Sequence, residues 1–386
     1  MVGKGLNRAF EAGESKDINL KTAQMVQLIS EIGPDIPEIA RRLGQFKESV
    51  RYRYKEKILN KGFAIQAIVD YSRLGLRHLE MFVGFSEEFR EHAQTILIAM
   101  SELCYVSGFE KIFPTGDYMV GADVPEEFVD EYMDFILGLR QKGLFSHVNV
   151  HTFDWFRRIP MRTQFYDFSA GRWDFDWSTR TAGGFDTTAY TPSERGRFDL
   201  LDLLILKELY IDASRPLIEI SRKLGENYKK LAWHYNKHVK SGLIKGYTLR
   251  WPGTKYNFKV ERALHRQHRY FWIDLLVRNL SEVERMELVS KVNRLPFVWA
   301  EAGGRDYFAQ FAFPVDFLTE AMQHLESILG PVRDRAELHM PDQTSALAFT
   351  ISYKRYNQKS QRWTFDAPAL QSRFAELILK IKESRG

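Results

Sequence analysis

The sequence predicts an α+β protein made of two tandem units, each a winged helix-turn-helix followed by a ferredoxin-like βαββαβ domain. The first observation is a repeated helix and turn, since residues 38–44 (EIARRLG) match residues 219–225 (EISRKLG) at an offset of 181 (225 − 44 = 181). Each copy is then followed by strands and helices in the ferredoxin-like order. A later motif, Tyr166 with Arg172-Trp173, recurs as Tyr356 with Arg362-Trp363. The whole unit is therefore duplicated.

Length and composition describe an ordinary soluble globular chain with more than one module. The chain has 386 residues, of which 44% are hydrophobic and 27% charged, and this length exceeds what one compact core usually accommodates. A net charge of +5 is compatible with a polyanionic partner, and its placement matters more than its sum.

Cysteine usage and hydropathy exclude several classes of protein. Cys104 is the only cysteine, which excludes an intrachain disulfide or a thiolate metal cluster. We expect it to be buried as a small hydrophobic residue. No apolar run reaches the length that spans a bilayer, and the first residues lack the apolar core of a signal peptide. We therefore expect a cytoplasmic protein without a membrane partner.

The first helix-turn-helix is predicted over residues 19–70, after a polar tail at 1–18. Apolar residues at spacings of three indicate a helix that stops at Gly33-Pro34. A second short helix over 36–43 ends at Gly44, and a third over 47–60 carries an inward row of apolar side chains. Alternation over 63–69 predicts the strand behind the third helix.

The first ferredoxin-like domain is predicted over residues 76–176, including an extension that contains Trp173. Its strands are expected at 79–85, 105–113, 117–122 and 145–153, and its helices at 86–103 and 125–142. Two helices would cover one face of the sheet and leave the other face for a partner.

The second half repeats this plan after a linker at residues 177–196, which is rich in Ser, Thr and Gly. We expect a winged helix-turn-helix over 197–252 and a ferredoxin-like domain over 268–366, whose last strand lies around 346–353. An amphipathic helix is predicted within 367–386. Trp173 and Trp363 are expected to pack the two extensions onto a sheet.

The third helix of each helix-turn-helix is the candidate DNA-binding surface, because that helix enters the major groove in such motifs. Cations there would contact phosphates and give salt-dependent binding, and arginines could also contact guanine edges. The alternative is a solvated basic face. In the first copy the candidates are Lys47, Ser49, Arg51, Tyr52, Arg53 and Lys57. In the second copy, where aromatics suit backbone contacts, they are Tyr228, Lys229, Lys230, Trp233, His234 and Lys237.

These motifs resemble the Lrp/AsnC (feast/famine) family of transcription regulators of archaea and bacteria. Residues 38–44 and 219–225 carry the likeness, together with the strand phrase 242–247 (GLIKGY) and the hinge-like 69–76 (VDYSRLGL). The resemblance implies a sequence-specific, double-stranded-DNA-binding regulator. Family members usually carry one unit and dimerise, so this chain would be an intramolecular pseudo-dimer with its sheets face to face, and a further homodimer stays open.

The resemblance also implies a small-molecule effector such as an amino acid. Gly116-Asp117-Tyr118 and its counterpart Arg305-Asp306-Tyr307 look like the family's strand motif opposite the effector site. Asp117 and Asp306 are therefore the effector-binding candidates. Ordinary Asx turns are the alternative for both aspartates.

The sequence offers no evident catalytic, metal or cofactor site. His234 and His238 lie four apart on a helix, as zinc ligands do, but no Glu follows His234 in the HExxH manner and no third ligand is near in the sequence. Gly-rich phosphate loops and nucleophile elbows are also absent. We therefore expect no bound metal, no cofactor and no enzymatic activity.

Two rival functions stay open. Siroheme decarboxylases look like the Lrp/AsnC family, with helix-turn-helix pieces that need not bind DNA, and a tetrapyrrole with its Soret absorbance would identify an enzyme of that kind. An architectural, chromatin-type DNA binder is the second rival, which footprinting would distinguish from a specific regulator.

Overall fold

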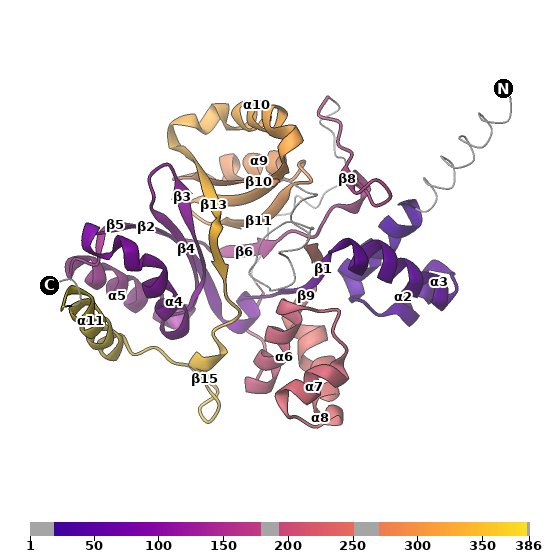
Figure 1. Ribbon diagram of the computed structural model, residues 1–386, viewed down its shortest axis with the longest axis horizontal. Coiled ribbons are helices and arrows are strands. Elements are labelled where there is room, and N and C mark those ends of the chain that lie inside the picture. The colour runs from indigo at the N-terminus through magenta and orange to yellow at the C-terminus, as the bar shows by residue number, and fades with distance from the viewer. Residues whose placement is uncertain (1–18, 179–192, 251–269, 384–386) are drawn as a thin grey trace.

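The computed structural model describes residues 19–178, 193–250 and 270–383. The predicted tail at 1–18 and most of the predicted linker at 177–196 lie outside these residues. Within them, helices and strands follow one another twice in the same order (Figure 1). The α+β prediction of two tandem helix-turn-helix and ferredoxin-like units is confirmed.

The first helix-turn-helix begins with a helix at residues 19–32, which buries Met25, Val26 and Ile29. It continues with α2 (Ile36–Leu43), α3 (Lys47–Arg53), a π-helical stretch (Tyr54–Ile58) and β1 (Ala64–Val69). Gly44 ends α2 with a φ of 61°, a left-handed conformation that favours glycine. The turn between α2 and α3 therefore follows directly from the sequence.

The second helix-turn-helix has the same elements: α6 (Leu200–Ile211), α7 (Leu217–Leu224), α8 (Tyr228–His234), a π-helical stretch (Tyr235–Leu243) and β9 (Ile244–Arg250). Gly225 ends α7 with a φ of 67°. The strands β1 and β9 pair antiparallel, from Ala64 opposite Arg250 to Val69 opposite Ile244. This two-stranded sheet joins the two helix-turn-helix units.

The two ferredoxin-like domains provide most strands of one nine-stranded sheet, whose two halves are joined by the last strand, β13 (Ala336–Ala348), and are each called a sheet below. The first consists of β2 (Leu76–Phe85), α4 (Ala93–Leu103), β3 (Val106–Phe113), β4 (Tyr118–Pro125), α5 (Val129–Gln141) and β5 (Phe145–Thr152). The second consists of β10 (Tyr270–Val277), α9 (Glu282–Val292), β11 (Val298–Gly303), β12 (Tyr307–Pro314), α10 (Leu318–Leu329) and β13 (Ala336–Ala348).

The last strand was predicted around 346–353, which is wrong, because β13 already begins at Ala336. Pro341 and Asp342 explain why the strand was not predicted over its full length, since both residues are unfavourable inside a strand. In the structure they lie where the strand leaves one sheet for the other. β13 pairs with β10 over Ala336–His339 and with β3 from Met340 onward.

The two units exchange strands reciprocally. The strand order is β5-β2-β4-β3-β13-β10-β12-β11-β6. The second half of β13 lies beside β3 of the first unit, and β6 (Trp155–Arg158) lies beside β11 of the second unit. Figure 1 shows β6 crossing the centre of the molecule between the units. Each unit therefore completes the sheet of the other.

The sheet faces that the helices leave uncovered meet in an apolar cluster. Its members come from the strands of both units and the loop after β5: Phe82, Ile112, Met119, Phe153, Leu276, Ala302 and Phe308. Their burial removes apolar surface from water on both sheets at once. The two sheets therefore share an apolar interface.

The two Trp-bearing hairpins are also exchanged. The hairpin of β7 (Tyr166–Asp167) and β8 (Arg172–Trp173) packs Trp173 against Phe297 of the second unit. The hairpin of β14 (Tyr356–Asn357) and β15 (Arg362–Trp363) packs Trp363 against Tyr105 of the first unit. The final helix, α11 (Ala367–Glu383), then packs on α5, where Phe374 contacts Phe135.

Burial agrees with the expected role of the cysteine, since the Cys104 side chain is inaccessible to solvent. Among the residues that the structure describes, the helices are all too short or too polar to cross a bilayer.

Candidate functional site

A cavity of about 890 Å³ lies where the first helix, β6, β9 and α9 meet. Four cationic side chains line it: Arg157, Arg158, Arg162 and Lys245. Glu31 is the one acidic residue among the described lining residues. The cavity therefore has the charge and the size for an organic anion.

The strand exchange places Arg157 in this cavity. β6 pairs with β11 so that Arg157 lies opposite Glu301, and Arg157 Nε donates to Glu301 Oε1 at 2.5 Å. Glu301 is fully buried and also accepts a hydrogen bond from Tyr307 at 2.7 Å. A buried ion pair is held in one geometry when such additional donors satisfy the carboxylate.

The other two arginines are held by different partners. Arg158 Nη2 donates to the Tyr210 hydroxyl at 2.7 Å, and its guanidinium lies 5.4 Å from the Tyr210 ring centroid. Arg162 Nη1 donates to the carbonyl of Leu295 at 3.0 Å. Burial lowers the pKa of Arg162 to about 10, although the Glu301 charge opposes this shift. These contacts fix the arginines in place before any ligand arrives.

Lys245 is the second residue of β9 and contributes an amine to the cavity. Its Nζ lies 3.3 Å from Asp70 Oδ2. Burial lowers the pKa of Lys245, and the Asp70 charge opposes that shift. A lysine with a lowered pKa transfers a proton more readily than an exposed one.

A buried polar network lies between the sheets, beside Arg158. His78 Nδ1 is 2.7 Å from Asp123 Oδ1, and His78 Nε2 is 3.1 Å from Glu80 Oε1. Burial acts to lower the pKa of His78, but the hydrogen bonds to Asp123 and Glu80 outweigh burial and raise it to about 9. Nearby, burial and the charge of Glu80 raise the pKa of Glu110 to about 7.

The predicted DNA-binding residues of the first copy lie on and just after α3. Lys47, Ser49, Arg51 and Tyr52 are exposed. Arg53 is half-buried and donates to Gln45 Oε1 at 2.8 Å, and Lys57 is half-buried. The four exposed side chains form one accessible surface, whereas Arg53 also stabilises the turn.

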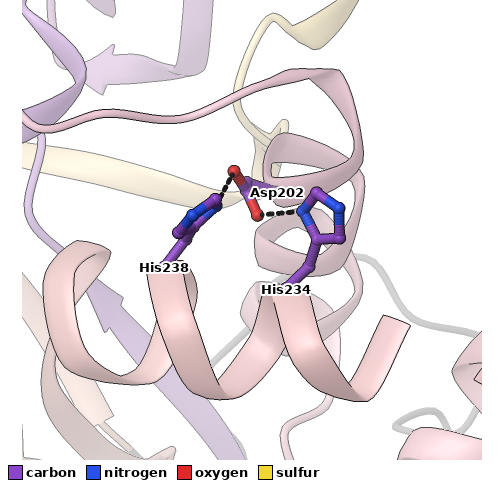
Figure 2. A group of neighbouring side chains, drawn as sticks. All are labelled: Asp202, His234 and His238. Atoms are coloured by element: carbon purple, nitrogen blue, oxygen red, sulfur yellow. Dashed lines mark hydrogen bonds and ion pairs between the residues drawn. The ribbon is translucent and has the colours of Figure 1, made fainter. Parts of the chain in front are cut away.

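In the second copy, five of the six candidates are exposed and His234 is not. Tyr228, Lys229, Lys230, Trp233 and Lys237 are all exposed. The prediction that His234 lies on the exposed face is wrong, because its ring turns inward to Asp202 of α6, with Nδ1 2.9 Å from Asp202 Oδ1 (Figure 2). A buried carboxylate on the neighbouring helix attracts the imidazole, and the sequence around His234 contains no sign of it.

The two effector candidates lie in separate surroundings. Asp117 is 3.3 Å from His147 Nε2 and lines a cavity of about 410 Å³. Asp306 Oδ2 is 2.7 Å from His151 Nδ1, and Asp306 Oδ1 accepts from the backbone N–H of Asn279 at 2.9 Å. Asp306 therefore has a structural role between the units, and effector binding at either residue stays a prediction.

Sequence reasoning missed the cationic cavity completely. The run 157–162 (RRIPMR) was a sequence signal for it, because the matching segment of the second copy, 347–352 (LAFTIS), contains no arginine. Lys245 gave no such signal. Its place beside the arginines depends on strand exchange and wing pairing, which join residues far apart in the sequence.

Comparisons with known proteins support the fold. Two crystal structures of the siroheme decarboxylase NirDL match with TM-scores of 0.53 and 0.52, at 12% and 13% identity. The matches cover 94% and 95% of this chain and 99% of the NirDL chain in each structure. The second structure is a co-complex of NirDL with an iron-uroporphyrin III analogue. The structure of PH0061 matches 37% of this chain and 92% of that one at 14% identity, with a TM-score of 0.28. Neither the family models nor the curated proteins give a sequence match.

These matches correct one expectation. NirDL, which this chain matches over 94% of its length, is an enzyme, and this match overturns the prediction that the chain is not an enzyme. The predicted fold stands, but a fold does not by itself indicate a transcription regulator.

Proposed function

We propose that this protein is an enzyme with siroheme-decarboxylase-like architecture, which binds a carboxylate-bearing iron tetrapyrrole in the cationic cavity. The observation that carries the proposal is the set of four cationic side chains around one cavity of about 890 Å³. The shared architecture with NirDL, which has been crystallised with an iron-uroporphyrin III analogue, supports this choice of substrate class.

The lining fits such a substrate in both charge and polarity. Guanidinium groups bind carboxylates through paired hydrogen bonds. Apolar side chains of the same wall, among them Leu20, Ala23 and Met161, would contact the flat macrocycle. A mixed lining of this kind is typical of small-molecule sites.

The cationic residues of the cavity have two proposed roles: three arginines bind the substrate, and Lys245 transfers a proton. Arg157, Arg158 and Arg162 would hold substrate carboxylates, since each is already oriented by Glu301, Tyr210 or a backbone carbonyl. Decarboxylation breaks the bond between a side-chain carbon and its carboxyl carbon, releases CO₂ and leaves an electron pair on the side-chain carbon. We assign Lys245 as the donor of the proton that this carbon takes up.

Absorbance spectroscopy tests binding, and mass spectrometry tests the reaction. Purified protein titrated with iron uroporphyrin III should show a shifted Soret band. Replacing Arg158 and Lys245 together by Gln should weaken binding by at least tenfold, whereas Lys230→Gln on α8, outside the cavity, should not. With siroheme as substrate, product mass should fall by CO₂ equivalents, and Lys245→Gln alone should slow this loss. Full-strength binding by the Arg158 and Lys245 double variant would overturn the site.

DNA binding by the recognition helices is a second candidate, favoured by the exposed Lys47, Arg51 and Tyr52 on α3. Affinity for a duplex, measured by fluorescence anisotropy, should fall steeply with salt. Replacement of Arg51, Arg53 and Lys57 together by Ala should remove most of it, and unchanged binding would count against this candidate. Footprinting would separate a specific regulator from an architectural binder.

A further inference from the structure

We propose that Asp202, His234 and His238 bind a divalent transition-metal ion, with zinc as the best match. His234 Nδ1 lies 2.9 Å from Asp202 Oδ1, and His238 Nδ1 lies 2.9 Å from the other carboxylate oxygen, Asp202 Oδ2. The three potential ligand atoms lie within 4.8 Å of one another. Figure 2 shows both imidazoles directed at the carboxylate from the same side of their helix. The proposal is independent of the tetrapyrrole site.

The backbone presents these ligands without rearrangement. His234 ends α8 and His238 follows four residues later in the π-helical stretch, so the two rings lie about one turn apart on one face. Asp202 occupies the first turn of α6 in a capping box with Asp199. Two rigid helices therefore supply the three side chains.

The spacing suits a tetrahedral ion. With bonds of about 2.0–2.2 Å to nitrogen and oxygen, neighbouring ligand atoms around zinc lie about 3.3 Å apart. The two N···O separations of 2.9 Å involve the two different carboxylate oxygens. Each needs to widen by a few tenths of an ångström if Asp202 binds the ion through both oxygens. Asp199 Oδ1, which is 3.7 Å from His234 Nδ1, is the candidate for a fourth ligand, with water as the alternative.

Charge and access also favour an ion. Asp202 is fully buried, the ion-pair partners described for it are the two histidines, and its Oδ2 also accepts a hydrogen bond from the backbone N–H of Asp199 at 2.9 Å. A buried carboxylate is costly unless a cation or several donors compensate it. The His238 side chain is 27% exposed, which leaves a path from solvent. Plain His–Asp hydrogen bonding is the competing interpretation, and metal titration distinguishes the two.

The first unit cannot form this site. The equivalent positions are Lys21, Arg53 and Lys57, since 202, 234 and 238 minus 181 give 21, 53 and 57. Three cations there exclude a metal. An ion in the second unit would fasten α8 to α6 and so fix the orientation of the second recognition helix.

Metal titration of the full chain tests the proposal. Chelator-treated protein should bind one Zn²⁺ per chain in calorimetry and raise its melting temperature, and Co²⁺ should give visible absorption bands of tetrahedral coordination. His238→Gln, at a half-exposed position, should fold normally and lose at least tenfold in zinc affinity. Asp202→Asn should abolish the cobalt bands.

Two controls address other histidines. His147→Gln alters a comparable His–Asp pair on the surface and should leave zinc affinity unchanged. A double replacement of His265 and His268 by Gln, outside the described residues, should also leave it unchanged. If zinc is lost in that double variant, or retained at full affinity in His238→Gln, the proposal is overturned.

Discussion

The two units share one fold but differ at equivalent positions of the strands that cross between them. Arg157, Arg158 and Arg162 of the first copy correspond to Leu347, Ala348 and Ser352 of the second, at an offset of 190 taken from Trp173 and Trp363 (363 − 173 = 190). The strand partners differ in the same way, because Arg157 pairs with Glu301 whereas Leu347 pairs with Phe109. One strand crossing is therefore ionic and its counterpart is apolar.

The helix-turn-helix units also differ, and here the second copy carries the cluster of potential ligands. At the contact between first and third helices, the first copy has cations and the second has the Asp202, His234 and His238 cluster. In a symmetric homodimer every substitution appears in both subunits. A covalent tandem removes that constraint, so one copy could acquire a cationic cavity while the other kept an apolar crossing.

The largest effect should come from breaking the ionic crossing. Glu301→Ala leaves Arg157 without its buried carboxylate and should lower the free energy of unfolding by about 3–5 kcal/mol. Urea denaturation measures this change. The double variant Arg157→Leu with Glu301→Phe, which copies the apolar crossing of the second unit, should recover part of the loss. A cost below about 1 kcal/mol for Glu301→Ala would show that the buried ion pair contributes no more than an exposed one.

The next largest effect should be a pH dependence of stability that comes from the first unit. His78 and Asp123 of the first sheet lie opposite each other, and hydrogen bonding that outweighs burial raises the pKa of His78 to about 9. This raised pKa stabilises the fold fully below the unfolded pKa of about 6.5, and the stabilisation is lost as pH rises through about 9. Unfolding free energy should fall by about 1–3 kcal/mol over that window. His78→Phe should flatten this dependence, and a profile that it leaves unchanged would assign the effect elsewhere.

The exchanged hairpins should behave alike, which makes them a test of symmetry. Trp363 Nε1 donates to the carbonyl of Leu74 at 2.8 Å, and Trp173 Nε1 donates to the Tyr270 hydroxyl at 3.1 Å. Trp→Phe at either position removes one buried hydrogen bond and some packing, for a cost of about 1–2 kcal/mol. Thermal denaturation should give similar losses for both. A much larger loss for one would show that one exchanged hairpin contributes more.

The smallest effect should come from the two turn glycines. Gly44 and Gly225 both have positive φ, and a Cβ at either would meet open space. Ala at each should cost about 1 kcal/mol from backbone conformation alone. Equal melting temperatures for the two variants would confirm that the turns are equivalent, whereas unequal ones would reveal a difference in the surrounding helices.

The elements themselves were largely predictable, because each rests on local patterns. The repeated EIARRLG-type helix ending at glycine predicted α2 and α7, and alternation over 63–69 predicted β1, which is found at Ala64–Val69. The start of β13 was missed because Pro341 resembles a strand breaker, and only the crossing between two sheets explains why it is tolerated there.

The functional residues were less predictable. The exposed cations of α3 follow from helical periodicity, but His234 shares that periodicity and lies buried. Its partner Asp202 is 32 residues earlier, a separation at which sequence spacing carries no information about contact.

The amino-acid sequence by itself determined the duplication, the order of helices and strands, and the basic recognition helix, because these depend on interactions between near neighbours along the chain. Only the tertiary structure decided that β6 and β13 change sheets, that three arginines meet Lys245 around one cavity, and that two histidines converge on Asp202. Those arrangements come from packing two apolar sheet faces against each other, which brings distant segments together in a way that no local pattern records.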